Sequence, residues 1–179
     1  MKKTVLTFGL ISGAIISVMM LATVPFQDQI GFDKGAIIGY TTMVLSFLLV
    51  GFGVRSYREN VGHGTISFGR AFSVGILITT ITCVCYVATW EVIYYNFMPG
   101  FAEKYASYEI EKAKASGATQ QQLDTKLEEM KKFNEMYKNP LVNAAITFVE
   151  PFPVGLVITL LAAAALRRKR EGAAVAPVA

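Results

Sequence analysis

Two acidic residues, Glu91 and Glu150, interrupt otherwise uncharged apolar stretches of the sequence and are the side chains best suited to chemistry. An ionised carboxylate near the middle of a bilayer costs roughly 3 kcal/mol or more unless it is paired or hydrated, so it usually faces protein or water. If the helices that carry them pack together, the two carboxylates could share a proton or bind a cation. Glu150 and Glu91 are therefore the ligand or proton candidates.

Each glutamate also has a structural explanation. A helix that begins at Pro151 would place Glu150 in its cap and leave residues 141–149 at the interface. That helix would have about 16 residues, fewer than the usual 17 to 25 of a membrane span. We therefore favour one long helix that is kinked around Pro151 and Pro153. Glu91 follows Trp90 in an aromatic segment typical of the membrane surface, where its side chain would simply reach water.

Other reactive side chains are few. His63 is the only histidine and lies in a glycine-rich turn, which lacks the pattern of a phosphate-binding loop. Cys83 and Cys85 lie two positions apart in an apolar stretch, so on a helix they point to different sides, and we predict no disulfide between them. No Cys and His residues have metal-binding spacing. We predict no catalytic residue, no metal site and no cofactor, and an enzyme ranks third among the possible functions.

Basic residues gather at the ends of the apolar stretches. Cationic flanks are retained on the cytoplasmic side of a membrane, which explains these residues fully, and an anionic lipid is a further candidate ligand for them. The candidates for anionic lipid binding are Arg55, Arg58, Arg70, Arg167, Arg168, Lys169 and Arg170.

The elements that must position these residues are apolar helices. Of the 179 residues, 53% are hydrophobic and 17% are charged, and the mean hydropathy is +0.44, against about 25% charged residues in soluble domains. This composition excludes a disordered or nucleic-acid-binding protein. Runs of about 20 apolar residues are long enough to cross a bilayer. The sequence predicts an all-α, polytopic membrane protein, a single domain over 1–179, with four spans at about 4–24, 35–54, 71–97 and 141–166.

The charge distribution predicts the orientation of these spans. Lys2 and Lys3 precede the first run, which we interpret as a retained anchor because it is longer than the apolar part of a typical signal peptide. In a four-span arrangement all six arginines lie on the same side as these lysines. Both termini are therefore predicted to be cytoplasmic, in a bacterial inner membrane, with residues 99–139 on the opposite side.

Small residues suggest how the spans pack. Gly9 and Gly13 form a small-residue stripe on the first span, and Gly75 belongs to a similar stripe on the third. Such stripes allow helices to approach closely. Packing within one chain is the favoured use of these glycines, and a homo-oligomer is the alternative.

Residues 99–139 are predicted to form two amphipathic helices with a break at Ser116-Gly117. Thr119 and Gln122 fit a capping box that opens the second helix. The predicted apolar stripes are Phe101, Tyr105 and Tyr108 in the first helix, and Leu123, Leu127, Met130 and Tyr137, with Phe133 beside them, in the second. The pair could fold as a hairpin, extend the membrane helices, or lie on the bilayer surface, and the sequence does not select among these.

Three short motifs carry a resemblance to a known family. They are Gly-Phe-Gly-Val-Arg-Ser-Tyr-Arg-Glu-Asn at 51–60, Ile-Ser-Phe-Gly-Arg-Ala-Phe at 66–72, and Tyr-Tyr-Asn-Phe-Met-Pro at 94–99. With the arrangement of spans, they make the chain similar to a bacterial membrane family known as domain of unknown function 4199. The resemblance implies a four-helix membrane architecture over nearly the whole chain and no established activity.

Two functions compete. The preferred one is a non-enzymatic scaffold or interaction protein in the lipid bilayer, which contacts a protein partner through residues 99–139. The alternative is a small proton- or cation-coupled transporter that uses Glu91 and Glu150, although such apolar helices provide little of the polar pathway that transport needs.

Overall fold

The computed structural model describes residues 1–168, and all regular secondary structure in this part of the chain is helical. The all-α fold class predicted from the sequence is therefore confirmed. The helices are α1 (Lys2–Thr23), the short 3₁₀ helix η1 (Val24–Phe26), α2 (Gln27–Asn60), α3 (Phe68–Asn96), α4 (Phe101–Ala115), α5 (Gln120–Tyr137), α6 (Pro140–Val149) and α7 (Phe152–Leu166).

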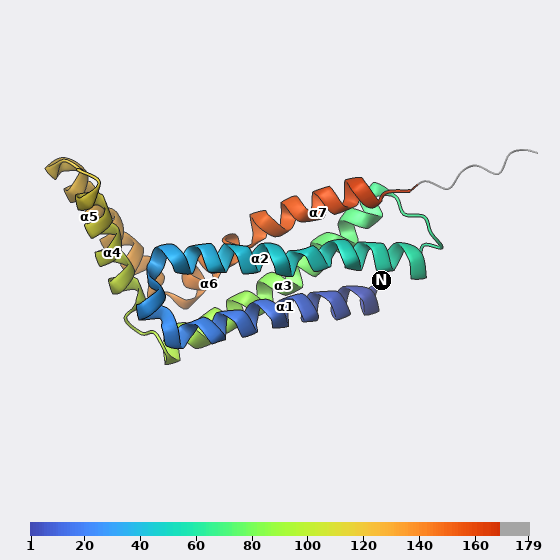
Figure 1. Ribbon diagram of the computed structural model, residues 1–179, viewed down its shortest axis with the longest axis horizontal. Helices are drawn as coiled ribbons and strands as arrows, with labels where there is room; N and C mark the ends of the chain where they lie inside the picture. The colour runs from blue at the N-terminus through green and yellow to red at the C-terminus, as the bar shows by residue number, and fades with distance from the viewer. Residues whose placement is uncertain (169–179) are drawn as a thin grey trace, which may run out of the picture.

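Four helices, α1, α2, α3 and α7, run side by side as an elongated bundle (Figure 1). Three continuous helical stretches are long and apolar enough to cross a membrane: Lys2–Asn60, Phe68–Asn96 and Pro140–Leu166. The first contains both α1 and α2, which pack against each other after the chain turns at η1. The protein therefore has the helices of a membrane protein, and the count of four spans stays a prediction.

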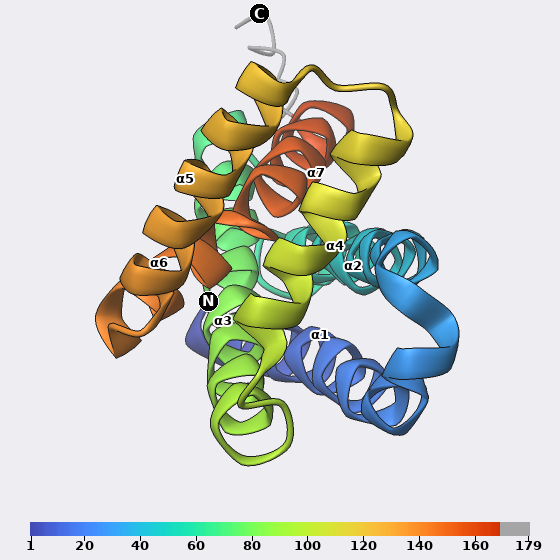
Figure 2. The same ribbon diagram turned by 90° about the vertical axis from the view of Figure 1, so that its left-hand side faces the viewer.

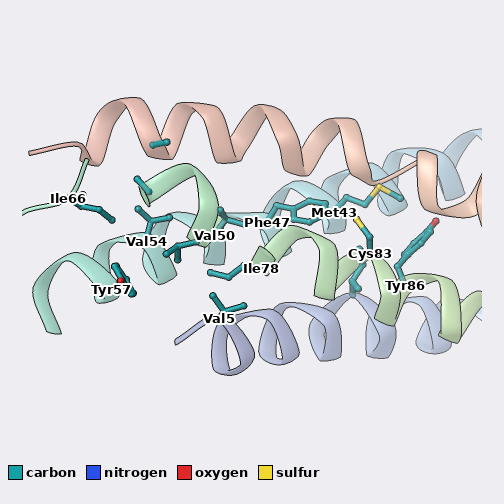
Figure 3. Close-up of a cluster of buried hydrophobic side chains, with 14 residues drawn as sticks. Val5, Met43, Phe47, Val50, Val54, Tyr57, Ile66, Ile78, Cys83 and Tyr86 are labelled. Carbon is teal, nitrogen blue, oxygen red and sulfur yellow. The ribbon is translucent and has the colours of Figure 1, made fainter. Parts of the chain in front are cut away.

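The centre of the bundle is filled by apolar side chains from α2 and α3, including Phe47, Val50 and Ile78, which are fully buried (Figure 3). Buried hydroxyl groups link the helices around this core. The Thr79 and Thr159 hydroxyls lie 3.0 Å apart between α3 and α7. Helices without bulky side chains at their contacts approach closely enough for such bonds.

The predicted packing glycines lie at helix contacts within the chain. Gly9 and Gly13 of α1 face Ile81 and Cys85 of α3, and a Cβ atom on Gly13 would lie 2.6 Å from the Cys85 sulfur. Gly75 of α3 likewise lies against α7, where a Cβ would meet Thr159 at 2.7 Å. Any larger side chain at these positions would force the helices apart.

The turn between α1 and α2 is tighter than the sequence indicated. The second helix begins at Gln27, eight residues before the predicted span at 35, and is interrupted at Gly31. Gly31 has φ 72°, a left-handed conformation that glycine adopts at little cost. This kink redirects the chain into the long part of α2 and leaves Phe32 beside α4.

Helices α4 and α5 form a hairpin that lies across one end of the bundle (Figure 2). The predicted break is present, with Gly117 at φ 81°, and the capping box of Thr119 and Gln122 is confirmed. An ion pair of 3.0 Å between Lys126 and Glu109 joins the two helices. Of the three arrangements that the sequence allowed, the structure has the hairpin.

The predicted fourth span is divided at Glu150 and Pro151, which separate α6 from α7. Both residues keep right-handed helical backbone angles, so the chain is kinked there without a loop. Pro151 and Pro153 have no N–H group to donate to the carbonyls four residues earlier, which explains the break. Asn139 caps α6, since its side chain accepts a hydrogen bond from Leu141 N at 3.0 Å.

Candidate functional site

A cavity of about 590 Å³ lies between the α4–α5 hairpin and the adjacent end of the bundle. We call it the hairpin cavity. Helices α1 to α6 all contribute to its wall, which is rich in aromatic side chains. The wall includes Asp33, Tyr40, Tyr86, Trp90, Tyr105, Glu109, Phe133, Tyr137 and Glu150.

Glu150 lies in the wall of the cavity at the junction of α6 and α7. The Tyr86 hydroxyl of α3 donates a hydrogen bond of 2.8 Å to Glu150 Oε2. Glu150 is nevertheless exposed, and it is one of the residues that line the cavity. The kink at Pro151 is what places this carboxyl group at a helix end, where it can reach the cavity.

The charges of the lining residues distinguish Glu150 from the other acids. Asp33 accepts a hydrogen bond of 2.8 Å from Lys112, and Glu109 is paired with Lys126. Within residues 1–168, Glu150 has no ion pair with a basic side chain. The cavity thus contains one acidic group that a bound cation could neutralise.

Residues of α3 reach the cavity because of helical spacing. Tyr86 and Trp90 are four positions apart and therefore lie on the same face of the helix. Trp90 Nε1 donates a hydrogen bond of 2.8 Å to the Tyr137 hydroxyl at the end of α5. Burial raises the pKa of the Tyr137 phenol, so this group stays neutral at physiological pH. The hydrogen bond joins the hairpin to the bundle next to Glu150.

An aromatic cluster closes the side of the cavity. The Phe32 ring, just after the Gly31 kink, lies 5.8 Å from Phe101 and 4.9 Å from Tyr108. Trp90 lies edge-on to Phe101 at 4.8 Å, and the Phe133 ring stacks on Tyr137 at 4.8 Å. Aromatic pairs at these distances contribute about 0.5–1.5 kcal/mol each beyond the area that they bury. The hairpin is therefore fixed to the bundle by its own apolar stripes.

Two ion pairs fasten α4 to the beginning of α2. Lys104 lies 3.1 Å from Asp28, and Lys112 lies 2.8 Å from Asp33. The hydrogen bond to Asp33 raises the pKa of Lys112 above its ordinary value. Because all four side chains are largely exposed, these pairs orient the hairpin more than they stabilise it.

Glu91 lies on α3 outside the lining of the hairpin cavity. Its Oε1 atom is buried and has no hydrogen-bond partner within residues 1–168. The side chain bonded to Glu150 is Tyr86, which sequence reasoning missed. The available signal was the spacing of Tyr86 and Trp90, which places two aromatic side chains with polar groups on one face of the third apolar run.

The remaining candidates lie elsewhere. Arg70 and Arg168 line a second cavity at the opposite end of the bundle, whereas Arg58 pairs with Glu59 at 2.6 Å. Arg55 and Arg167 are exposed at the same end, and Lys169 and Arg170 lie outside the described residues. His63 lies in the turn after α2, and Cys83 and Cys85 are free thiols. In the described part of the chain no three His, Cys, Asp or Glu residues are grouped as metal ligands.

The comparison with known families agrees with the motifs and the helical architecture. The family described as "Protein of unknown function (DUF4199)" matches residues 7–168, and the chain belongs to this family. The resemblance seen in the sequence is thereby confirmed. No curated protein and no solved structure matches the chain.

Proposed function

We propose that this protein is a polytopic membrane protein that binds a small cation, either a proton or an organic cation, at Glu150 in the hairpin cavity. The observation that carries the proposal is the charge of this site. Among the described residues 1–168, Glu150 has a hydroxyl donor, Tyr86, but no basic partner, while the other two acids of the cavity wall are each paired with a lysine.

The chemistry of the wall suits a cation. Tyr86 holds Glu150 Oε2, which leaves Oε1 free to contact a ligand. Aromatic rings attract a cation through their negative faces, by about 0.5–2 kcal/mol for each well-placed ring. Tyr40, Trp90 and Tyr105 supply such rings around the cavity. A volume of about 590 Å³ is within the usual range for a small-molecule site.

The scaffold role preferred from the sequence has less support. It needed the apolar faces of residues 99–139 to be available to a partner, yet Phe101, Tyr105 and Tyr137 pack inside the chain. Leu127 and Met136 remain exposed on α5. They are nine positions apart and so lie on opposite sides of the helix, which gives no continuous contact face. We therefore rank cation binding first and partner binding second.

The proposed topology has four spans in a bacterial inner membrane, with both termini in the cytoplasm and the hairpin outside. It is supported by the position of the N-terminus at the end of the bundle opposite the hairpin (Figure 1). Arg55, Arg70 and Arg168 lie at that same end, as the retention of positive charge on the cytoplasmic side requires. Reporter fusions after Gly117 and after Ala179 test it. A cytoplasm-specific reporter that is active at Gly117 would contradict the four-span topology.

The single tryptophan provides a direct test of the binding site, because Trp90 lies in the cavity wall. We expect tetraethylammonium, or a pH titration, to change Trp90 emission in a saturable way in purified protein. Glu150→Gln should weaken the response to the organic cation at least about tenfold, the equivalent of about 1.4 kcal/mol, or remove the pH transition.

Glu91→Gln is the matched control. It removes a carboxylate next to Trp90 in sequence but outside the cavity wall, and should leave both responses unchanged. If Glu150→Gln responds like the unmodified protein to both the organic cation and pH, Glu150 is not the binding group.

A further inference from the structure

A second cavity, of about 440 Å³, lies at the end of the bundle opposite the hairpin. Its wall is formed by Tyr57 of α2, the turn between α2 and α3, Arg70 in the first turn of α3, and Arg168 after α7. We propose that this arginine cavity, named for Arg70 and Arg168 in its wall, binds a phosphate-bearing anion, with the headgroup of an anionic phospholipid as the expected source.

The two arginines are brought together by the backbone. Ile66 and Arg168 form an antiparallel bridge, with Ile66 N donating to Arg168 O and Arg168 N donating to Ile66 O, both at 2.9 Å. This bridge fixes the segment after α7 against the segment before α3. Arg168 thus lies beside Ile66, 102 positions earlier in the chain, and the pairing is not a consequence of sequence proximity.

The charge of the cavity is uncompensated. Within residues 1–168, no acidic residue lines it. Glu59, the acid at the end of α2, is engaged by Arg58 through two hydrogen bonds of 2.9 and 2.6 Å. The side chain of Arg70 makes only a long contact of 3.9 Å with the Met1 sulfur, and no ion pair in the described residues involves Arg70 or Arg168. Both guanidinium groups can therefore bind an anion through parallel N–H bonds.

The backbone around the arginine cavity also favours the binding of an anion. Ser67 caps α3, and its side chain accepts a hydrogen bond from Arg70 N, so the positive end of this 29-residue helix is at the wall. Gly62 lies where a Cβ atom would be 2.1 Å from Thr65 O, so the turn is closely packed. Arg70 is thus fixed in the first turn of α3, and Arg168 is fixed by its bridge to Ile66 beside this compact turn.

The retention of positive charge on the cytoplasmic side explains why arginines are present at this end. It does not require two of them to share a cavity while Arg58 is turned toward Glu59 and the Leu166 carbonyl. The two explanations differ in one respect. Topology depends on the number of charges, whereas a binding site depends on which arginine is removed.

The test measures binding of short-chain lipids to the full-length protein in a nonionic detergent, which removes the general attraction to a charged bilayer. Native mass spectrometry would follow dioctanoyl phosphatidylglycerol, with dioctanoyl phosphatidylcholine for comparison. We expect Arg70→Gln and Arg168→Gln each to weaken phosphatidylglycerol binding about tenfold. Arg55→Gln, which removes an exposed arginine outside the cavity, is the matched control and should change binding less than about twofold.

Arg70→Lys guards against a folding artefact, because it keeps the charge and removes the bidentate geometry. It should give an intermediate affinity with unchanged thermal unfolding in the absence of lipid. If millimolar inorganic phosphate competes with the lipid, the site binds phosphate from a soluble source. If inorganic phosphate does not compete, the lipid headgroup is the source. Equal binding of the two lipids by the unmodified protein, or equal losses in Arg55→Gln and Arg70→Gln, would overturn the proposal.

Discussion

The bundle and the α4–α5 hairpin are held together by different kinds of side chain. At the contacts within the bundle, glycines such as Gly13 lie against the neighbouring helix, and hydroxyls such as those of Thr79 and Thr159 bond across it. The hairpin is held by the ring contacts around Tyr137 and by ion pairs. In lipid, burial of apolar area does little to drive helices together. Close packing and hydrogen bonds hold them together instead. At the hairpin, by contrast, the contacts are mainly between aromatic rings, which bury large apolar areas.

The largest effect is expected when an aromatic residue that holds the hairpin on the bundle is removed. Tyr137→Ala deletes a buried ring that contacts Tyr94 and Phe133, together with the hydroxyl that accepts the Trp90 hydrogen bond. We expect hairpin docking to lose about 3–5 kcal/mol, as for other buried aromatic residues. Hydrogen exchange of the α4 and α5 amides should accelerate strongly, while α1 stays protected. Tyr95→Ala, at an exposed tyrosine, is the control. Unchanged exchange in α5 would show that the ring contacts do not hold the hairpin.

A bulky residue at a bundle contact should have the next largest effect. Gly13→Leu places a side chain where Cys85 atoms already lie at 2.6 and 2.7 Å from a Cβ position. Overpacking of this kind costs about 1–3 kcal/mol. Thermal unfolding in detergent, followed by circular dichroism, should shift to lower temperature. Gly51→Leu is the matched control, because no atom would lie within 4 Å of a Cβ at that position. Equal shifts for the two variants would mean that close approach of α1 to α3 is unimportant.

The buried hydroxyl pair tests the polar part of the bundle contacts. Thr79→Val keeps the side-chain shape but removes the bond to Thr159. Hydrogen bonds between membrane helices contribute about 0.6 kcal/mol on average, so we expect a loss of that order. A double-mutant cycle with Thr159→Val measures the coupling itself. Additive effects of the two changes would show that the hydroxyls, although 3.0 Å apart, do not stabilise the contact.

The smallest effect should come from the ion pair within the hairpin. Lys126 pairs with Glu109 at 3.0 Å, and this hydrogen bond raises the pKa of Lys126 above its ordinary value of 10.5. The contribution of the pair is therefore complete below about pH 10 and is lost as the pH rises through the raised pKa. Lys126→Met should cost less than about 0.5 kcal/mol. Unfolding of the hairpin followed by Trp90 emission measures it, with Lys131→Met as the control; a loss that persists above pH 12 would contradict the charge explanation.

Features that depend on neighbouring residues were predictable from the sequence. The apolar runs predicted the helices, Gly117 the break, and Thr119 with Gln122 the capping box, since each is determined within one or two helical turns. The kink beside Glu150 follows equally from Pro151 and Pro153.

The parts of the two cavities that come from distant segments could not be predicted. Five positions separate Tyr86 from Glu91, which is a rotation of about 140° around a helix, so only one of them can face the hairpin cavity. Which one does so depends on how α3 is rotated against α6. An apolar run without a clear polar face does not indicate this rotation. Phe32 and the Ile66–Arg168 bridge likewise depend on contacts that no local pattern encodes.

The kinked C-terminal stretch is synthesised last, and this determines when the two cavities acquire all their charged residues. Glu150, the acidic group of the hairpin cavity, and Arg168, one of the two bases of the arginine cavity, both come after Asn139 in the chain. While a ribosome has made only α1 to α5, neither cavity has its full set of charges. Synthesis through α6 and Glu150 supplies the last residues of the hairpin cavity, whereas the arginine cavity also needs Arg168, which follows α7. A ligand of the arginine cavity can therefore stabilise the protein only after its last described helix is in place.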